Sequence, residues 1–190
     1  MVQIPYSLLS TFFMSELLEV IQLGHPTLRT PACFVKNIAD ARIQKLIDDL
    51  IVTVKQSNGV GIAAPQVNYS DRLFIVASHP NDRYPHAPEM APTAMINPQI
   101  LAHSSEVTKG WEGCLSIPGI RGLVPRHQAI EVEYTDRNGK LQKQQLTDFV
   151  ARIFQHEHDH LDGIVFLDRL ESTLDIITEQ EYQKQIVSTS

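Results

Sequence analysis

The sequence predicts an α+β domain, in which strands come first and a helix with functional residues follows late in the chain. The segment LFIVA, from Leu73 to Ala77, is a short apolar run typical of a buried strand. Ile130, Val132 and Tyr134 alternate with two glutamates, which indicates a strand with one buried face. Apolar residues at helical spacing return after residue 147. This order of elements favours an α+β fold.

Length and composition are those of a single globular domain. The 190 residues leave room for a substantial core, and no internal repeat is visible. Hydrophobic residues make up 43% of the chain and charged residues 20%, as in ordinary soluble proteins. A net charge of -6 argues against non-specific nucleic-acid binding, which needs a basic surface. No apolar run approaches the length of a membrane span.

Two further features concern the cell compartment and the start of the chain. Cys33 and Cys114 are too few for a disulfide framework, so a reduced cytoplasmic setting is expected. The first 13 residues are apolar but lack the basic start and the cleavage site of a secretory signal. Met14 is an equally good start, so residues 1–13 are either an extension or an error in the assigned gene start.

The first half of the chain alternates between predicted elements and loops. Apolar residues keep helical spacing between Asn37 and Ser57, and Asn58 with Gly59 is a natural stop. Residues 59–66 are too small in side chain for ordinary core. Residues 79–92 hold four prolines and predict a loop, which could rim a cleft, although we expect it to be inert surface. Residues 94–101 predict an edge strand, because the proline at position 98 cannot donate to a ladder.

The second half contains a hairpin, a helix and a tail. Asn138 and Gly139 predict a hairpin turn after the strand at 130–134. Thr147 or Asp148 is expected to cap the helix that follows, and Gly163 to end it. Residues 174–186 are acidic and weakly amphipathic, which predicts a tail that is helical in part.

The helix after residue 147 carries the strongest functional motif, His156-Glu157-His158-Asp159-His160, an H-E-x-x-H pattern. Positions i and i+4 of a helix lie on one face, so His156 and His160 can bind one metal ion together. Glu157 lies beside the first ligand, where a carboxylate can handle the protons of a metal-bound water. His158 points to a different face and is not expected to be a ligand.

A catalytic metal site needs a third protein ligand and an open position for water. Metzincin proteases take it from a histidine where this chain has Phe166, which excludes that family. Glu171 could serve only if a second element folded it back across the helix. Cys114, beside Gly113, is the stronger candidate, because a thiolate with two imidazoles suits zinc or ferrous iron. A lone cysteine is nevertheless more often a small buried hydrophobe.

Three separated signatures decide between these readings of Cys114. They are GVGIAAPQ at 59–66, EGCLS at 112–116 and QHEHDHLDG at 155–163. With these motifs in this order, the chain strongly resembles the peptide deformylases from Leu17 to Leu170. The resemblance implies antiparallel β-sheets around a central helix that carries H-E-x-x-H. It also implies an extension at 1–13, a catalytic domain at 14–170 and a tail at 171–190.

The resemblance implies a hydrolase that removes the N-formyl group from the first methionine of new polypeptides and releases formate. Its partners would be formyl-methionine nascent peptides emerging at the ribosome, without specific nucleic-acid or membrane binding. Cys114, His156 and His160 would bind one divalent metal ion, natively Fe(II), with zinc, nickel or cobalt possible in preparations. Glu157 would take the proton of the water and later give it to the leaving amine.

The resemblance also assigns the remaining site residues. The side-chain amide of Gln66 and the backbone N–H of Leu115 would donate to the developing oxyanion. Val60, Gly61 and Gly113 would pair with the extended substrate like an added strand. The methionine side chain would enter an apolar pocket partly walled by Arg152 and Ile153.

Some questions stay open on the sequence alone. Arg121 and Arg126 occupy family positions, where either a substrate contact or an ion pair with a carboxylate such as Glu112 would fit. The acidic tail does not support a basic ribosome-docking helix. One alternative function is a metallopeptidase that cleaves internal peptide bonds, which would need neither Cys114 nor Gln66. The other is a non-enzymatic relative whose metal is only structural.

Overall fold

The computed structural model describes residues 15–81 and 83–186. Within these residues the strands form two antiparallel sheets. The larger sheet has the order β1-β2-β3-β6-β7 and comprises β1 (Gly61–Ala63), β2 (Leu73–Val76), β3 (Thr93–His103), β6 (Ala129–Thr135) and β7 (Leu141–Thr147). The smaller sheet has the order β4-β5-β8 and comprises β4 (Val107–Cys114), β5 (Ile117–His127) and β8 (Ile176–Thr178).

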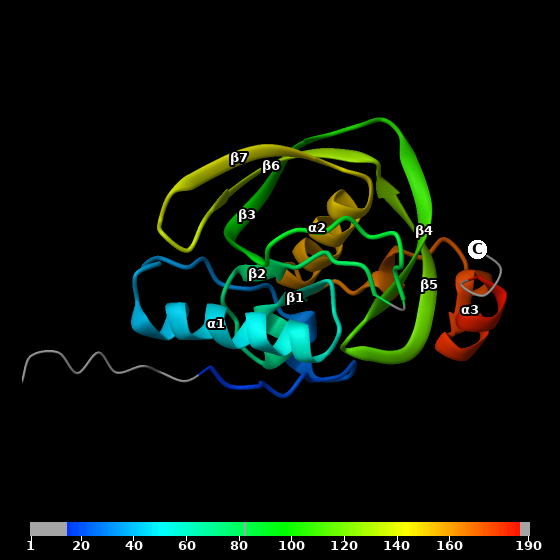
Figure 1. The fold of residues 1–190 in the computed structure, drawn as a ribbon, viewed down its shortest axis with the longest axis horizontal. Coiled ribbons are helices and arrows are strands. Elements are labelled where there is room, and N and C mark those ends of the chain that lie inside the picture. Colours follow the sequence, from blue (N-terminus) through cyan, green and yellow to red (C-terminus); the bar gives the residue numbers. More distant parts are fainter. Residues whose placement is uncertain (1–14, 82, 187–190) are drawn as a thin grey trace, which may run out of the picture.

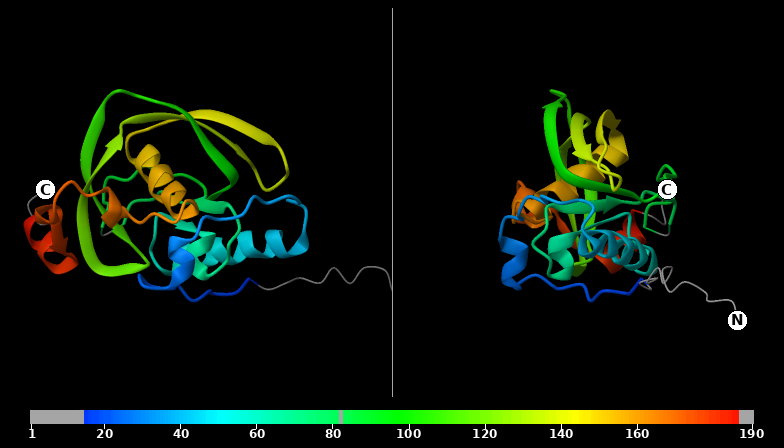
Figure 2. Two further views of the ribbon diagram at one scale, coloured as in Figure 1. Left: turned by 180° about the vertical axis from the view of Figure 1, so that it is seen from behind. Right: turned by 90° about the vertical axis from the view of Figure 1, so that its left-hand side faces the viewer.

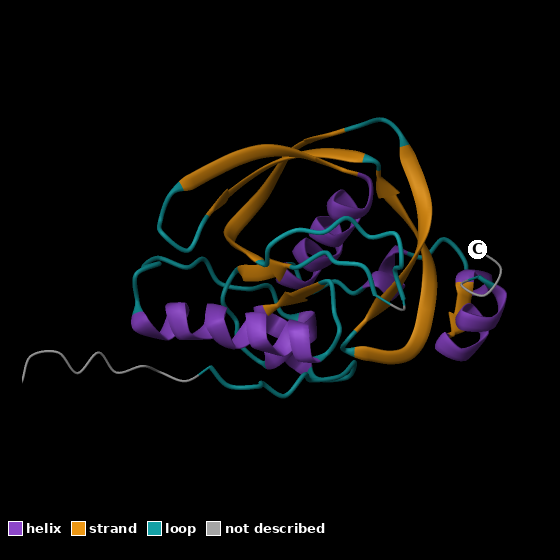
Figure 3. Cartoon of the chain, in the orientation of Figure 1, coloured by secondary structure: helices purple, strands orange, loops and turns teal. Residues whose placement is uncertain are grey.

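Three α-helices accompany the sheets in the described part of the chain (Figure 1). Helix α2 lies inside the arc that β3, β6, β7 and the β4–β5 hairpin form, as Figures 1 and 3 show. Helix α1 lies outside β1 and β2, and the view from behind in Figure 2 shows the same arrangement. The predicted α+β fold with antiparallel sheets around a central helix is therefore confirmed. The helices are α1 (Ala41–Gln56), α2 (Asp148–Leu161) and α3 (Glu179–Gln185).

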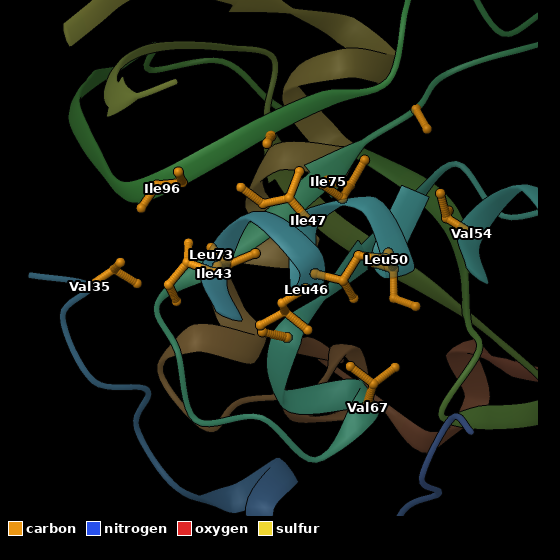
Figure 4. Close-up of a cluster of buried hydrophobic side chains, with 14 residues drawn as sticks. Val35, Ile43, Leu46, Ile47, Leu50, Val54, Val67, Leu73, Ile75 and Ile96 are labelled. Carbon is orange, nitrogen blue, oxygen red and sulfur yellow. The ribbon is translucent and has the colours of Figure 1, made fainter. Parts of the chain in front are cut away.

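Strand β2 is apolar at every position, and helices cover both of its faces. Leu73 and Ile75 pack in one buried cluster with side chains of α1 (Figure 4). Phe74 and Val76 point to the opposite face and pack with side chains of α2. Because successive side chains of a strand point to opposite faces, a strand covered on both sides must be apolar at every position. Burial of all four residues follows from this.

Helix α1 confirms the helix predicted between residues 37 and 57. The carboxylate of Asp40 accepts a hydrogen bond from the Arg42 backbone N–H and caps the first turn. Asn58 has a positive φ of 50° and follows the end of the helix. The buried face consists of residues at helical spacing, labelled in Figure 4: Ile43, Leu46, Ile47, Leu50 and Val54.

The prediction of an edge strand at residues 94–101 is wrong. Strand β3 lies in the middle of the larger sheet and pairs with β2 and with β6. The register shifts between Ile96 and Gln99, and Asn97 adopts a φ of 51°. Pro98 lies within this irregularity, where a bulge interrupts the ladder, and a missing N–H there costs no regular hydrogen bond.

The hairpin and the helix that follow it lead directly to the site. Strands β6 and β7 pair across the predicted turn, in which Gly139 has a φ of +80°. Thr147 occupies the N-cap position of α2 but makes no side-chain capping bond. Asp148, the first helical residue, has a φ of 51° and accepts a hydrogen bond from the Gln128 side chain. Gly163, with a φ of +74°, follows the end of the helix as predicted.

The C-terminal part of the described chain returns to the smaller sheet. Strand β8 pairs antiparallel with β5, and α3 follows at once. None of the described helices has the length and apolar character needed to cross a membrane. Residues 1–13, predicted as an extension, lie outside the described residues.

Candidate metal centre and active site

Three side chains from two distant segments converge between β4 and α2. Cys114 ends β4, and His156 and His160 lie one turn apart on α2. Their ligand atoms lie within 4.8 Å of one another, and all three residues are buried. The Cys114 Sγ and His160 Nε2 atoms are 3.3 Å apart, near the roughly 3.5 Å expected for sulfur and nitrogen around one tetrahedral ion. The donor set therefore fits a divalent metal ion.

Other candidates for a third ligand lie elsewhere. Glu171 is exposed and pairs with Lys109 at 2.8 Å, so the alternative that placed it on the metal is wrong. His158 contacts Arg72 through its Nε2 atom at 3.2 Å, on a different side of α2. His158 is not part of the converging group found among the described residues.

Glu112 orients the first histidine. The Nδ1–H of His156 donates to Glu112 Oε2 at 2.9 Å, which leaves Nε2 for a metal ion. Arg126 donates to both carboxylate oxygens of Glu112, at 2.9 and 3.0 Å. Burial alone would raise the pKa of Glu112, but Arg126 and His156 hold it well below its usual range. The sequence placed Glu112 in the EGCLS signature but did not identify this role.

Cys114 and the neighbouring Glu157 both have shifted pKa values. Burial alone would raise the pKa of the Cys114 thiol, but the adjacent His160 and His156 lower it to about 5. Burial raises the pKa of Glu157 to about 7, although His156 and His160 act in the opposite direction. Glu157 Oε2 and His160 Nδ1 are buried without a hydrogen-bond partner among the described residues. Few buried polar atoms in proteins lack a hydrogen-bond partner, so these two atoms mark a candidate functional site.

Gln66 is held by its neighbours and is not a loop-exposed side chain. It lies in the 3₁₀-helix Ala64–Val67 and is only 1% exposed. Its Oε1 atom accepts from the Ala63 backbone N–H at 2.8 Å. That bond directs Nε2 toward Cys114 Sγ at 3.3 Å and Ser116 Oγ at 3.4 Å. The amide nitrogen of Gln66 therefore lies beside Cys114, one of the three converging residues.

A narrow cavity of about 50 Å³ opens beside these groups. Such a volume holds only a few water-sized groups. Gly61 lies against the Glu157 carboxylate, since a Cβ atom at this position would be 2.4 Å from Glu157 Oε1. The residues that line the cavity include all the predicted substrate contacts and both predicted oxyanion donors, namely Val60, Gly61, Gln66, Gly113, Leu115, Arg152 and Ile153.

The arginines are engaged with protein groups. Arg152 donates to the carbonyl oxygens of Thr108 at 2.6 Å and Val124 at 2.8 Å, so its guanidinium ties α2 to the β4–β5 hairpin while the residue lines the cavity. Arg126 pairs with Glu112 and also with Asp159, at 2.6 Å. Arg121 pairs with Glu179 of α3. Of the two roles that the sequence left open for Arg121 and Arg126, substrate contact or ion pair, the structure shows ion pairs for both.

The expectation that residues 79–92 form inert surface is wrong. Arg83 and Tyr84 line the cavity. The Tyr84 hydroxyl accepts a hydrogen bond from Arg121 Nη1 at 2.7 Å, and its ring packs on Phe149 with centroids 4.9 Å apart. No local sequence pattern predicts this role, because the residues that contact Tyr84 lie on β5 and α2. Trp111 and Phe149 line the same cavity and were also absent from the predicted site.

The geometry agrees with the comparisons to known proteins. The family model described as polypeptide deformylase matches residues 17–175. The chain belongs to the polypeptide deformylase family. It is similar to peptide deformylase 2 of Nostoc sp., with 72% identity over 175 residues that cover 92% of this chain and 98% of that protein. Peptide deformylase 2 of Shewanella oneidensis is 43% identical over 168 residues, covering 88% of this chain and 92% of that protein.

Solved deformylase structures share the fold. A class I type b peptide deformylase from Acinetobacter baumannii with bound Met-Ala-Ser has a TM-score of 0.81 and 45% identity. That match covers 83% of this chain and all of the other. The peptide deformylase of Synechococcus elongatus in complex with actinonin has a TM-score of 0.74 and 36% identity, covering 83% and 81% of the two chains. As a family member, the chain is a metal-dependent hydrolase that removes the N-formyl group from new polypeptides.

We predict that Gly61→Ala lowers kcat/KM about 100-fold, because a displacement of about 1 Å at a reacting group has an effect of this size. The new methyl group would overlap Glu157 Oε1 and would also lie 2.9 Å from Ile153 Cγ2. Steady-state kinetics measure the loss, while metal content and the urea midpoint show whether the variant is intact. Full activity in a folded Gly61→Ala protein would contradict the close approach of this backbone to Glu157.

Proposed function

We propose that Cys114, His156 and His160 hold one divalent metal ion, and that this ion is Fe(II) in the cell. The lowered pKa of Cys114 supports this assignment, since a thiolate is the form that binds metal. The hydrogen bond from His156 to Glu112 supports it too, because it presents Nε2. When bound, a divalent ion lowers the pKa of a water molecule to about 7 and polarises a carbonyl oxygen. Zinc, nickel or cobalt can bind the same donors in preparations.

Glu157 moves the protons of the reaction. Its unpartnered Oε2 atom is buried beside the two histidines, within reach of a water molecule that attacks the formyl carbon. Glu157 takes a proton from this water as the new C–O bond forms. It then gives the proton to the methionine nitrogen as the C–N bond breaks, and formate leaves together with a free amino terminus. The chain's residues thus return to their starting protonation state.

Two N–H donors stabilise the oxyanion that forms on the formyl oxygen. The first is the Gln66 amide, which the Ala63 N–H group holds in one orientation. The second is the backbone N–H of Leu115, the residue next to Cys114. Donors that are already in place need no rearrangement when charge develops, and loss of one typically costs about 10²–10³ in rate.

The substrate lies along the edge of β4. Val60 and Gly61 on one side and Gly113 on the other pair with its backbone like strands of a sheet. The methionine side chain enters the space beside Arg152 and Ile153. The narrow cavity accepts a formyl group and excludes larger acyl groups. These substrates are nascent peptides emerging at the ribosome, in the cytoplasm.

We expect formyl-Met-Ala-Ser to be hydrolysed at least about 100-fold faster than acetyl-Met-Ala-Ser, because the extra methyl group meets the cavity wall. Release of formate and of acetate is measured with the metal-loaded enzyme under the same conditions. An unmodified peptide with a free amino terminus serves as the control for endoproteolysis. Equal rates for both acyl groups, or cleavage of the unmodified peptide, would favour the metallopeptidase alternative.

Glu157→Gln is expected to lower kcat by about 10²–10⁴ while metal content stays the same, because the amide cannot accept the proton of the water. The matched control is Glu181→Gln, an exposed change on α3 away from the cavity. Metal analysis accompanies the kinetics of both variants. Unchanged turnover by Glu157→Gln would remove this carboxylate from the mechanism.

Metal retention should separate two histidines of the same helix. We expect His156→Gln to lose most of its metal, since two ligands bind far more weakly than three, whereas His158→Gln keeps about one ion per chain. Protein purified without oxygen is analysed for iron, zinc, nickel and cobalt, and activity is assayed in parallel. Zinc in fully active anaerobic protein would contradict the assignment of Fe(II).

A further inference from the structure

Arg121 is a fully buried cation at the junction of three segments. It lies on β5, and its side chain has no exposed surface. Its Nε atom donates to Glu179 Oε2 at 2.5 Å and its Nη2 atom to Glu179 Oε1 at 3.1 Å. Its remaining terminal nitrogen donates to the Tyr84 hydroxyl at 2.7 Å. The guanidinium carbon also lies 5.2 Å from the Tyr84 ring centroid and 4.7 Å from that of Tyr182.

The carboxylate partner comes from the C-terminal helix, which Figure 1 shows beside β5 at one end of the molecule. Burial alone would raise the pKa of Glu179, but the hydrogen bond from Arg121 lowers it, so the pair is charged at neutral pH. A planar guanidinium bound through two nitrogens has one preferred orientation. Glu179 therefore determines the direction in which the third nitrogen of Arg121 points.

Two neighbours of this guanidinium, Tyr84 and Gly113, belong to the cavity wall. Tyr84 lines the cavity and packs on Phe149, which lines it as well. Gly113, also on the wall, lies so close to Arg121 that a Cβ atom would be 3.1 Å from the guanidinium carbon. Arg121 and Glu179 do not themselves line this cavity. Glu179 lines a neighbouring cavity that shares Arg83, Gly113, Cys114 and Leu115 with it.

We propose that Glu179 of α3 is a positioning residue for substrate selection, acting through Arg121 on Tyr84 and Gly113. Helix α3, near the C-terminus, then contributes to substrate selection at the active site. Tyr84 packs on Phe149, which lies one helical turn before Ile153 on α2, and all three residues line the cavity where the proposed function places the first side chain of the substrate. The inference rests on that placement.

The test compares substrates that differ only in the side chain that meets this wall. Formyl-Met-Ala-Ser and formyl-Ala-Ala-Ser are assayed with wild type, Glu179→Ala, Glu179→Gln and Tyr84→Phe. We expect Glu179→Ala to reduce the preference for methionine about 5- to 20-fold, through a higher KM for the methionine peptide with kcat nearly unchanged. Glu179→Gln should fall between it and wild type, because the amide keeps one acceptor oxygen. Tyr84→Phe should reproduce the change, because it removes the hydroxyl that accepts the hydrogen bond from Arg121 Nη1.

Controls separate positioning from general damage. Glu181→Ala, on the same helix, removes a carboxylate that bonds only to neighbours on α3, Lys184 and Gln185, and should keep the wild-type preference. The double variant Glu179→Ala/Tyr84→Phe should change the preference no more than either single variant, since both act on one contact. Metal content and the urea midpoint are measured for every protein.

Three results would overturn the proposal. They are an unchanged preference in Glu179→Ala, an equal loss for both peptides, and additive effects in the double variant.

A readout without turnover keeps the test independent of the proposed reaction. Trp111, the only tryptophan, lines the cavity, so its fluorescence reports binding of the products Met-Ala-Ser and Ala-Ala-Ser. Failure of wild type to release formate would count against the proposed function, whereas weaker binding of Met-Ala-Ser alone in Glu179→Ala would still support the positioning role.

Discussion

The buried carboxylate of Glu112 joins the two parts of the molecule that must meet to form the site. It accepts hydrogen bonds from His156 and Arg152 on α2 and from Arg126 on β5, while itself lying on β4. A buried charge is tolerated only when its oxygens are paired, and removal of one partner of such a pair typically costs about 3–5 kcal/mol. The helix can therefore approach the β4–β5 hairpin in one position. In that position Cys114 lies opposite the two histidines.

A second constraint comes from the sheet that α2 covers. Helix α1 packs on one face of β2 and α2 on the other, so the helix with the histidines is enclosed on its apolar side. Phe74 and Phe154 meet edge to face there, with ring centroids 5.1 Å apart. The opposite side of α2 faces the hairpin and carries the polar groups. Apolar packing on one side and a satisfied charge network on the other give the ligands a rigid support, as a preorganised site requires.

Small residues and charged residues have different roles at the cavity. The absence of a side chain at Gly61 allows the backbone to lie against Glu157, and the absence of one at Gly113 leaves room for the Arg121 guanidinium. Buried carboxylates and arginines in and around the wall hold these segments together. A buried arginine is paired with two partners in two places. Arg126 lies between Glu112 and Asp159, and Arg121 lies between Glu179 and Tyr84.

Local patterns in the sequence were sufficient for the α+β class, for α1, for the β6–β7 hairpin and for the helical pairing of His156 with His160, because each depends on neighbours within a few residues. Cys114 and Gln66 needed the family signatures, since a single cysteine or glutamine carries no signal of its own. The tertiary structure alone decided that β3 is central, because a bulge at Pro98 is invisible in composition. It alone decided that Tyr84 lines the cavity and that Glu179 pairs with Arg121, because the buried charge of Arg121 draws together residues that lie 37 and 58 positions away from it in the chain. Such pairings minimise the cost of a buried charge over the whole fold, and no short stretch of sequence contains both partners.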